Sequence, residues 1–73
     1  MKQLVECVPN ISEGRDQGII DAVTAAVREV AGVALLDVDP GRDTNRTVIT
    51  FVGAPDTVGE AAFRLVARAA QLI

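Results

Sequence analysis

The chain has 73 residues, of which 49% are hydrophobic and 23% are charged, and its formal net charge is −3. This composition is typical of a globular domain and excludes a disordered segment, and a chain this short holds one domain at most. The acidic balance excludes a basic surface for nucleic acid, and no apolar run is long enough to span a membrane. One cysteine gives no internal disulfide, and the N-terminus lacks a secretory pattern, so we predict a cytoplasmic protein.

The first half of the chain predicts a strand followed by a helix. Residues 4–8 form a short apolar run that ends at Pro9 and is typical of a β-strand. Residues 16–31 carry apolar positions at helical spacing, with Gly32 as a stop signal. Ser12 and Asp16 are both candidates for the cap of this helix.

The second half predicts two strands and a second helix. Residues 33–39 form a strand that ends in the turn signal of residues 39–41, and residues 46–52 are rich in the residue types that strands prefer. Apolar positions recur at helical spacing over residues 55–73, and Pro55 suits the first turn of a helix. Because no Gly, Asn or Pro closes this helix, we expect the chain to be a truncated part of a larger domain.

The order of these elements, β-α-β-β-α, predicts an α+β fold of the ferredoxin-like kind. We expect an open-faced sandwich, in which two helices cover one face of a mixed three-stranded sheet. The first two strands are expected to be parallel, with the second in the centre and antiparallel to the third. Side chains alternate between the two faces of a strand, and this alternation places Ala34, Leu36 and Val38 toward the helices. It places Val33, Leu35, Asp37 and Asp39 on the uncovered face.

Two polar loops begin where the first two predicted strands end. Residues 8–15 and residues 37–46 are therefore expected to be neighbours in space, at the edge where open α/β sheets bind ligands. Each loop also has a simpler interpretation, as a helix cap or a solvated turn, with Asn45 in a left-handed turn position. Cys7 is expected to be a small core residue, and no Cys/His cluster offers a metal site.

Three stretches of the sequence resemble a known family. LVECVPNISEGR (residues 4–15), LLDVDPGRDTNRTVITFVG (residues 35–53) and AAFRLVARAAQLI (residues 61–73) are similar to the N-terminal end of glutamate formiminotransferase. The same domain also occurs fused in formiminotransferase-cyclodeaminase. The resemblance covers residues 4–73, although Ile11 stands where the family commonly has Phe and residues 41–43 form a more charged turn.

The resemblance implies a folate enzyme of histidine degradation. Such enzymes move the formimino group from N-formimino-L-glutamate to tetrahydrofolate, the co-substrate, without a metal. The resemblance implies a catalytic role for Asp39, whose carboxylate would hold a cationic intermediate. It also implies that seven further residues line the substrate cleft: Asn10, Ser12, Glu13, Gly14, Thr44, Asn45 and Arg46.

The resemblance also implies that this chain is inactive alone. The chain has no histidine, and in the family a histidine-rich segment with the proposed general base follows the stretch that resembles residues 61–73. A second subdomain forms the other wall of the folate cleft. The exposed apolar residues expected at Val33, Leu35, Leu72 and Ile73 predict a homo-oligomer. The alternative is a free-standing ligand-binding or dimerisation module with the same topology.

Overall fold

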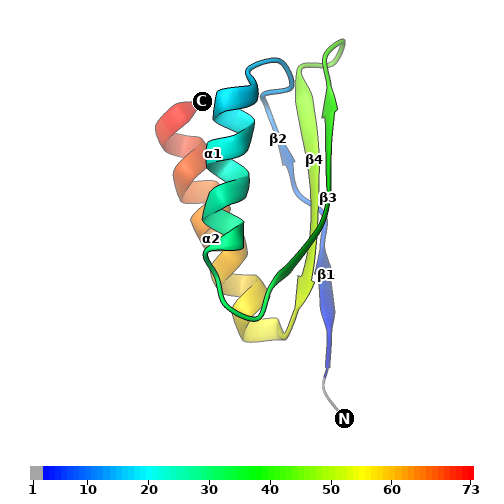
Figure 1. Ribbon diagram of the computed structural model, residues 1–73, viewed down its shortest axis with the longest axis vertical. Helices are drawn as coiled ribbons and strands as arrows, with labels where there is room; N and C mark the ends of the chain where they lie inside the picture. Colours follow the sequence, from blue (N-terminus) through cyan, green and yellow to red (C-terminus); the bar gives the residue numbers. More distant parts are fainter. Residues whose placement is uncertain (1–2) are drawn as a thin grey trace.

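The protein is described by a computed structural model over residues 3–73, and it forms two layers. One layer is a β-sheet and the other holds two helices that cover the same face of that sheet (Figure 1). This arrangement confirms the predicted α+β, ferredoxin-like open sandwich. The elements in chain order are β1 (Val5–Cys7), β2 (Asn10–Ile11), α1 (Gln17–Arg28), β3 (Ala34–Gly41), β4 (Arg46–Gly53) and α2 (Pro55–Leu72).

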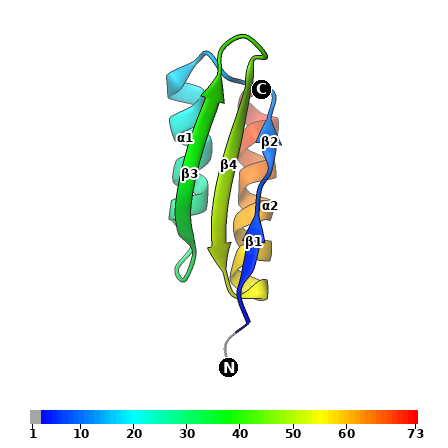
Figure 2. The same ribbon diagram turned by 90° about the vertical axis from the view of Figure 1, so that its right-hand side faces the viewer.

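The sheet has β4 in its centre. β3 pairs with one side of β4, while β1 and β2 pair with the other side, and every pairing is antiparallel (Figure 2). The predicted mixed, three-stranded pairing is therefore wrong in detail. β1 and β3 run in the same direction, but β4 separates them. The predicted first strand corresponds to β1, and β2 is an additional short strand after Pro9, in the segment that was predicted to be a loop.

β4 is central because its sequence suits burial better than that of β3. Alternate residues of β4 from Thr47 to Gly53 are buried, whereas β3 contains Pro40 and two aspartates and has no buried residue. Prolines, charges and bulges are features of edge strands. The prediction that the second strand lies in the centre is therefore wrong.

A β-bulge in β3 changes which face of the sheet the side chains before Asp37 lie on, relative to the predicted alternation. Leu35 pairs with Phe51, but Asp37 pairs with Thr50, so Leu36 is an extra residue on β3. Leu35 and Val33 therefore pack against the core, and Leu36 is 57% exposed. The prediction was wrong for these three residues and for Ala34, which is also exposed. Asp37 and Asp39 lie on the uncovered face, as predicted.

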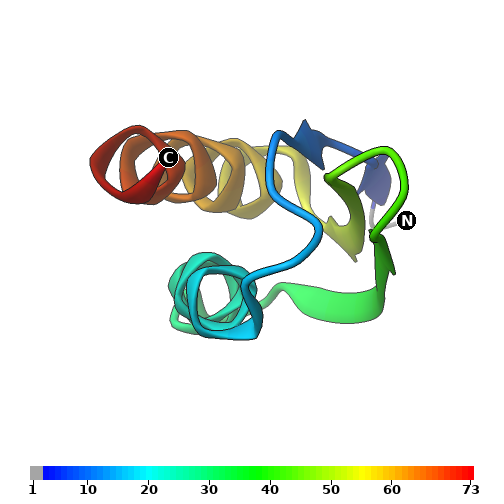
Figure 3. The same cartoon turned by 90° about the horizontal axis from the view of Figure 1, so that it is seen from above.

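The core lies between the sheet and both helices. Ile49 and Phe51 of β4 are fully buried against Val23 and Val27 of α1 and Ala61 of α2. Seen from above, α1 lies over the β3 side of the sheet and α2 over the side of β1 and β2 (Figure 3). Cys7 is half-buried and packs against this core, as predicted. Neither helix within residues 3–73 is long and apolar enough to cross a bilayer.

Candidate functional site

The two polar loops singled out in the sequence meet at one end of the sheet. The backbone N–H of Gly14 donates a hydrogen bond to Oδ1 of Asn45 at 2.9 Å. Nε of Arg15 donates to the carbonyl of Arg42 at 2.8 Å, and the hydroxyl of buried Thr47 donates to the carbonyl of Glu13 at 2.5 Å. We call this junction of residues 12–16 and residues 42–45 the rim. The predicted proximity of the two loops is confirmed.

Gly14 is buried at the rim because it lies directly on the backbone of the opposing hairpin. A Cβ at this position would lie 2.6 Å from the nitrogen and 2.7 Å from the oxygen of Arg46, and closer still to the carbonyl oxygen of Gly41. No side chain fits at such distances. Asn45 has a φ of 53°, a left-handed conformation that asparagine tolerates better than most residues.

The acidic side chains of the first loop stabilise the start of α1. Oε2 of Glu13 accepts hydrogen bonds from the backbone N–H groups of Arg15 and Asp16, both at 3.1 Å. Oδ1 of Asp16 accepts from the N–H of Ile19 at 3.2 Å, so Asp16 and not Ser12 caps the helix. These contacts fix the loop, and with it the position of Gly14.

The uncovered face of the sheet carries a second group of candidate residues next to the rim. Asp39 of β3 pairs with Val48 of β4, and Val48 pairs on its other side with Asn10 of β2. Because neighbouring strands lie about 4.8 Å apart, the Cα atoms of Asp39 and Asn10 are about 10 Å apart. Arg46 follows on the same face, about 7 Å from Val48 along β4.

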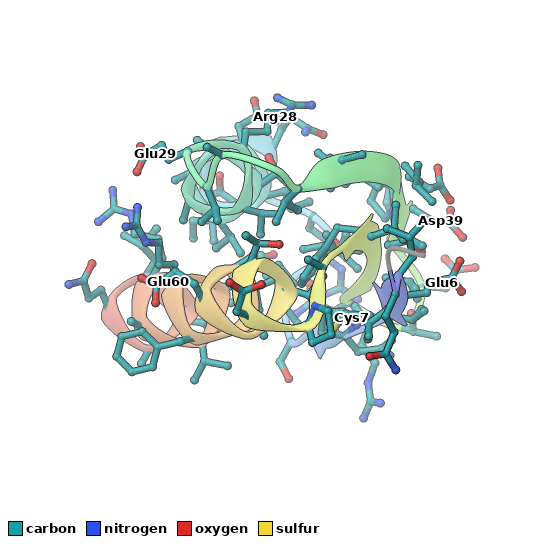
Figure 4. The ribbon with its side chains drawn as sticks, turned by 90° about the horizontal axis from the view of Figure 1, so that it is seen from below. Glu6, Cys7, Arg28, Glu29, Asp39 and Glu60 are labelled. Carbon is teal, nitrogen blue, oxygen red and sulfur yellow. The ribbon has the colours of Figure 1, made fainter. Side chains whose placement is uncertain are left out.

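This arrangement places a carboxylate, an amide and a guanidinium around one apolar side chain, Val48. Asp39, Asn10 and Arg46 are all exposed, and none of them has a side-chain hydrogen bond to another of residues 3–73. Figure 4 shows the side chains of Glu6 and Asp39 on the side of the sheet that faces away from both helices. The uncovered face is thus open, with its polar groups available to a ligand.

The eight candidate residues consequently fall into three groups. Glu13, Gly14 and Asn45 are engaged in contacts that hold the rim together. Thr44 donates a weak hydrogen bond to the carbonyl of Gly41 at 3.3 Å, and Ser12 is exposed beside the C-terminal end of α2. The three remaining candidates, Asp39, Asn10 and Arg46, are the ones around Val48.

Two further residues near the candidate site, Thr47 and Thr50, were not predicted from the sequence. Thr47 links β4 to the first loop through its hydroxyl, but in sequence it reads as an ordinary strand residue. Thr50 lies opposite Asp37 on the uncovered face. Its position opposite Asp37 depends on the register between β3 and β4, which no local sequence signal reveals.

Comparison with known proteins gives one consistent result. The family model described as "Formiminotransferase domain, N-terminal subdomain" matches residues 4–73. All 73 residues are 60% identical to a formimidoyltransferase-cyclodeaminase from Dictyostelium discoideum, of which they cover 14%. They are 58% identical to the protein of that name from Sus scrofa, again covering 14% of it. They are 44% identical to a glutamate formimidoyltransferase from Streptococcus pyogenes serotype M1, of which they cover 24%.

The chain thus spans between about a seventh and a quarter of the length of these relatives. The match extends over both loops of the rim, the uncovered face of the sheet and both helices. The resemblance seen in the sequence is therefore confirmed. The chain belongs to the formiminotransferase domain family and corresponds to its N-terminal subdomain.

Proposed function

We propose that this chain forms one wall of the transfer site of a glutamate formimidoyltransferase. The reaction moves the formimino group of N-formimino-L-glutamate to tetrahydrofolate, and both molecules are substrates that lie against the uncovered face. The names of the relatives support the type of transfer. The single observation that carries the proposal is the arrangement of Asp39, Asn10 and Arg46 around Val48 on that face.

The charges of this arrangement fit the substrates. The formimino group is an amidine, which is cationic when protonated, and the carboxylate of Asp39 would stabilise that positive charge as it persists through the reaction. The guanidinium of Arg46 matches the carboxylates of glutamate and of the folate tail in geometry and charge. Val48 offers an apolar contact between them, and the amide of Asn10 both donates and accepts hydrogen bonds.

The reaction needs a group that moves protons. N5 of tetrahydrofolate attacks the amidine carbon, which forms a new C–N bond and a tetrahedral intermediate, and N5 loses its proton. The bond between that carbon and the glutamate nitrogen then breaks, and the glutamate nitrogen takes up a proton. A general base near neutral pH is most often histidine, and this chain has none. We assign proton transfer to the remainder of the transferase domain.

The role of Asp39 is testable in a full-length transferase that carries residues 1–73 as its N-terminal segment. Such a protein is obtained by replacing the matched residues of the Streptococcus pyogenes relative, and we call it the chimeric transferase. We expect Asp39→Asn to lower kcat by about 10²- to 10³-fold, because the variant loses the charge but keeps the shape.

Asp37→Asn is the matched control. Asp37 lies on the same strand and the same face as Asp39, but it pairs with Thr50 and lies farther from Arg46 along the strand. We expect this variant to keep nearly full turnover. Wild-type kcat in Asp39→Asn, or an equal loss in both variants, would contradict the assignment of Asp39.

A cytoplasmic location, a homo-oligomeric state and a site free of metal belong to the same proposal.

A further inference from the structure

We propose that Asn45 and Thr47 are positioning residues, which act on a substrate through Arg46, the residue between them. Their hydrogen bonds to the first loop hold the backbone of Arg46 in place, so that its guanidinium meets a carboxylate of N-formimino-L-glutamate. The inference rests on the proposed function, because that function assigns carboxylate binding to Arg46. It adds two residues that support binding without touching the substrate.

Three consecutive residues around the start of β4 are each held by the first loop. Oδ1 of Asn45 accepts a hydrogen bond from the N–H of Gly14 at 2.9 Å, and the hydroxyl of Thr47 donates to the carbonyl of Glu13 at 2.5 Å. Between them, Gly14 lies against the backbone of Arg46, since a Cβ on Gly14 would lie 2.6 Å from the nitrogen and 2.7 Å from the oxygen of Arg46. We call these three contacts the Arg46 clamp.

The Arg46 clamp is fixed in turn to the helical layer. Oε2 of Glu13 accepts hydrogen bonds from two backbone N–H groups of its own loop, and Asp16 caps α1, whose Ile20 is buried. Thr47 is itself fully buried. The backbone of Arg46 is thus tied to the sheet through β4 and to α1 through the first loop, which fixes its place relative to the rest of the uncovered face.

The side chain of Arg46 receives no such support from the described residues. It is exposed, and within residues 3–73 it forms no side-chain hydrogen bond and no ion pair. Its partner on β3 is Gly41, which has no side chain to pack against the stem of the arginine. A long, free side chain loses conformational entropy when it binds, and a fixed backbone reduces that loss because it limits the region that the guanidinium explores.

Asn45 contributes to the Arg46 clamp through its backbone and its side chain. Its φ of 53° sets the direction in which the chain leaves the hairpin turn and enters β4 at Arg46. Asparagine tolerates this left-handed conformation, and the hydrogen bond to Gly14 stabilises it. Because the side chain of Asn45 is engaged with Gly14, its geometry favours a supporting role over the direct place in the substrate cleft that the resemblance implies.

The place of Arg46 relative to Asp39 indicates which carboxylate it binds. Asp39 pairs with Val48, and Arg46 precedes Val48 by two residues on the same face, so the Cα atoms of Asp39 and Arg46 are diagonal neighbours about 8 Å apart. In N-formimino-L-glutamate, the α-carboxylate and the formimino nitrogen are attached to the same carbon atom. In tetrahydrofolate, a benzoyl group separates N5 from the carboxylates. With the amidine at Asp39, Arg46 therefore reaches a carboxylate of N-formimino-L-glutamate, the donor substrate.

The first measurement concerns the backbone and involves no substrate. Thr47→Val keeps the shape of the side chain but removes the donor to Glu13, whereas Thr47→Ser keeps the donor. In NMR relaxation of the backbone amides of the 73-residue chain, we expect the order parameter of the Arg46 amide to fall from about 0.85 to below about 0.6 in Thr47→Val. Thr47→Ser should retain the wild-type value. The amide of Phe51, a fully buried residue of β4, should keep its value in both variants and is the control for folding.

The second measurement concerns substrate binding by the chimeric transferase. We expect Thr47→Val and Asn45→Gly to raise the KM for the donor substrate by about 3- to 10-fold, the effect of one long side chain that must be ordered on binding. The kcat and the KM for tetrahydrofolate should change by less than about twofold, a separation that general loss of structure does not produce. Thr47→Ser should keep the donor KM near the wild-type value. Asp43→Gly adds a glycine to the same turn without removing the bond to Gly14, so it is the matched control for Asn45→Gly.

A double-mutant cycle tests whether Arg46 carries the effect. Arg46→Gln should itself raise the donor KM by about 30-fold, because a charge-assisted hydrogen bond is lost. In that background, Thr47→Val should raise the donor KM by less than about 1.5-fold more, since no guanidinium remains to be positioned. Additive effects of the two substitutions would overturn the inference, because Thr47 would then act independently of Arg46.

Three further results would count against the inference. An unchanged order parameter at Arg46 in Thr47→Val would show that the clamp does not hold the backbone. A wild-type donor KM in Thr47→Val, beside a raised donor KM in Arg46→Gln, would show that binding does not depend on the clamp. A rise confined to the KM for tetrahydrofolate would assign Arg46 to the other substrate. Unchanged KM values for both substrates in Arg46→Gln would instead refute the proposed role of Arg46, on which the inference rests. If Asn45→Gly does not fold, the two Thr47 variants provide the same test.

Discussion

Gly14 lies against the backbone of the β3–β4 hairpin with no room for a side chain. We expect Gly14→Ala to lower the free energy of unfolding by about 3 kcal/mol, because the new methyl group overlaps backbone atoms that cannot move independently. Urea unfolding of the 73-residue chain measures this change. The overlap is specific to Gly14, so a glycine with free space around it makes the control.

Gly59 is that control. It lies on the exposed side of α2, and a Cβ there meets nothing within 4 Å. Gly59→Ala should raise the free energy of unfolding by about 0.5–1 kcal/mol, since alanine favours a helix over glycine. Equal stability of the Gly14→Ala and wild-type chains would show that the two loops are not in close contact.

A loss of activity after substitution would have a different cause for residues that hold the rim together than for residues on the uncovered face. Asn45 supplies both a left-handed backbone and the acceptor for the Gly14 N–H, and Glu13 holds the start of α1. Substituting either residue is expected to disturb the loop before it disturbs a ligand. Asp39, Asn10 and Arg46 make no such contacts, so their substitution reports on binding and chemistry more directly.

At the scale of elements, the bulge at Leu36 decides which side chains of β3 face the helices. With the extra residue, Leu35 packs on the core while Asp37 and Asp39 face outward. Deleting Leu36 would force either Leu35 outward or both carboxylates inward. We expect the deletion to lower the free energy of unfolding by about 3 kcal/mol, comparable to the loss of a buried leucine contact.

Leu36→Thr serves as the comparison, because Leu36 is itself 57% exposed. A change of about 0.5 kcal/mol or less is expected for this surface substitution. Thermal unfolding of both variants provides the measurement. A deletion variant as stable as Leu36→Thr would mean that β3 adjusts its pairing without cost.

The same bulge marks the limit of what the sequence predicts. The order of five of the six elements follows from periodicity, and the helix start at Pro55 follows from proline chemistry. The short strand β2 does not follow, because Asn10 and Ile11 read as part of the first polar loop. The proximity of the two polar loops, seen at Gly14 and Asn45, was predicted from parallel strands that end at one edge of the sheet; β1 and β3 do run in the same direction, although β4 lies between them. The face of the sheet on which Leu35 lies does not follow from the sequence, since an extra residue in a strand has no local signature. The central place of β4 depends on pairing between distant segments, for which only the burial pattern gives a hint.

At the scale of the whole molecule, we propose that the described chain supplies one side of the transfer site. Its polar groups lie on a sheet face that no other described element covers (Figure 4), and it has no histidine for proton transfer. We expect the 73-residue chain to give no formation of 5-formiminotetrahydrofolate above background when supplied with both substrates. The chimeric transferase, assayed by chromatography of the folates under the same conditions, should be active.

Turnover by the 73-residue chain alone would refute this expectation and would place the proton-transferring group among its own carboxylates. The inactive result is informative only if the chain is folded. Amide hydrogen exchange with solvent provides that control: we expect slow exchange at Cys7 and Ile11, because both residues pair with β4 in the folded sheet.

The described chain is elongated, with principal extents of 41, 21 and 13 Å. β1 begins at one end of the long axis, whereas the rim and the last turn of α2 lie at the other (Figure 1). A fluorophore or affinity handle attached ahead of β1 would therefore stand clear of the rim, and one attached after Ile73 would lie at the same end of the molecule as the rim. Labels for binding measurements belong at the start of this polypeptide.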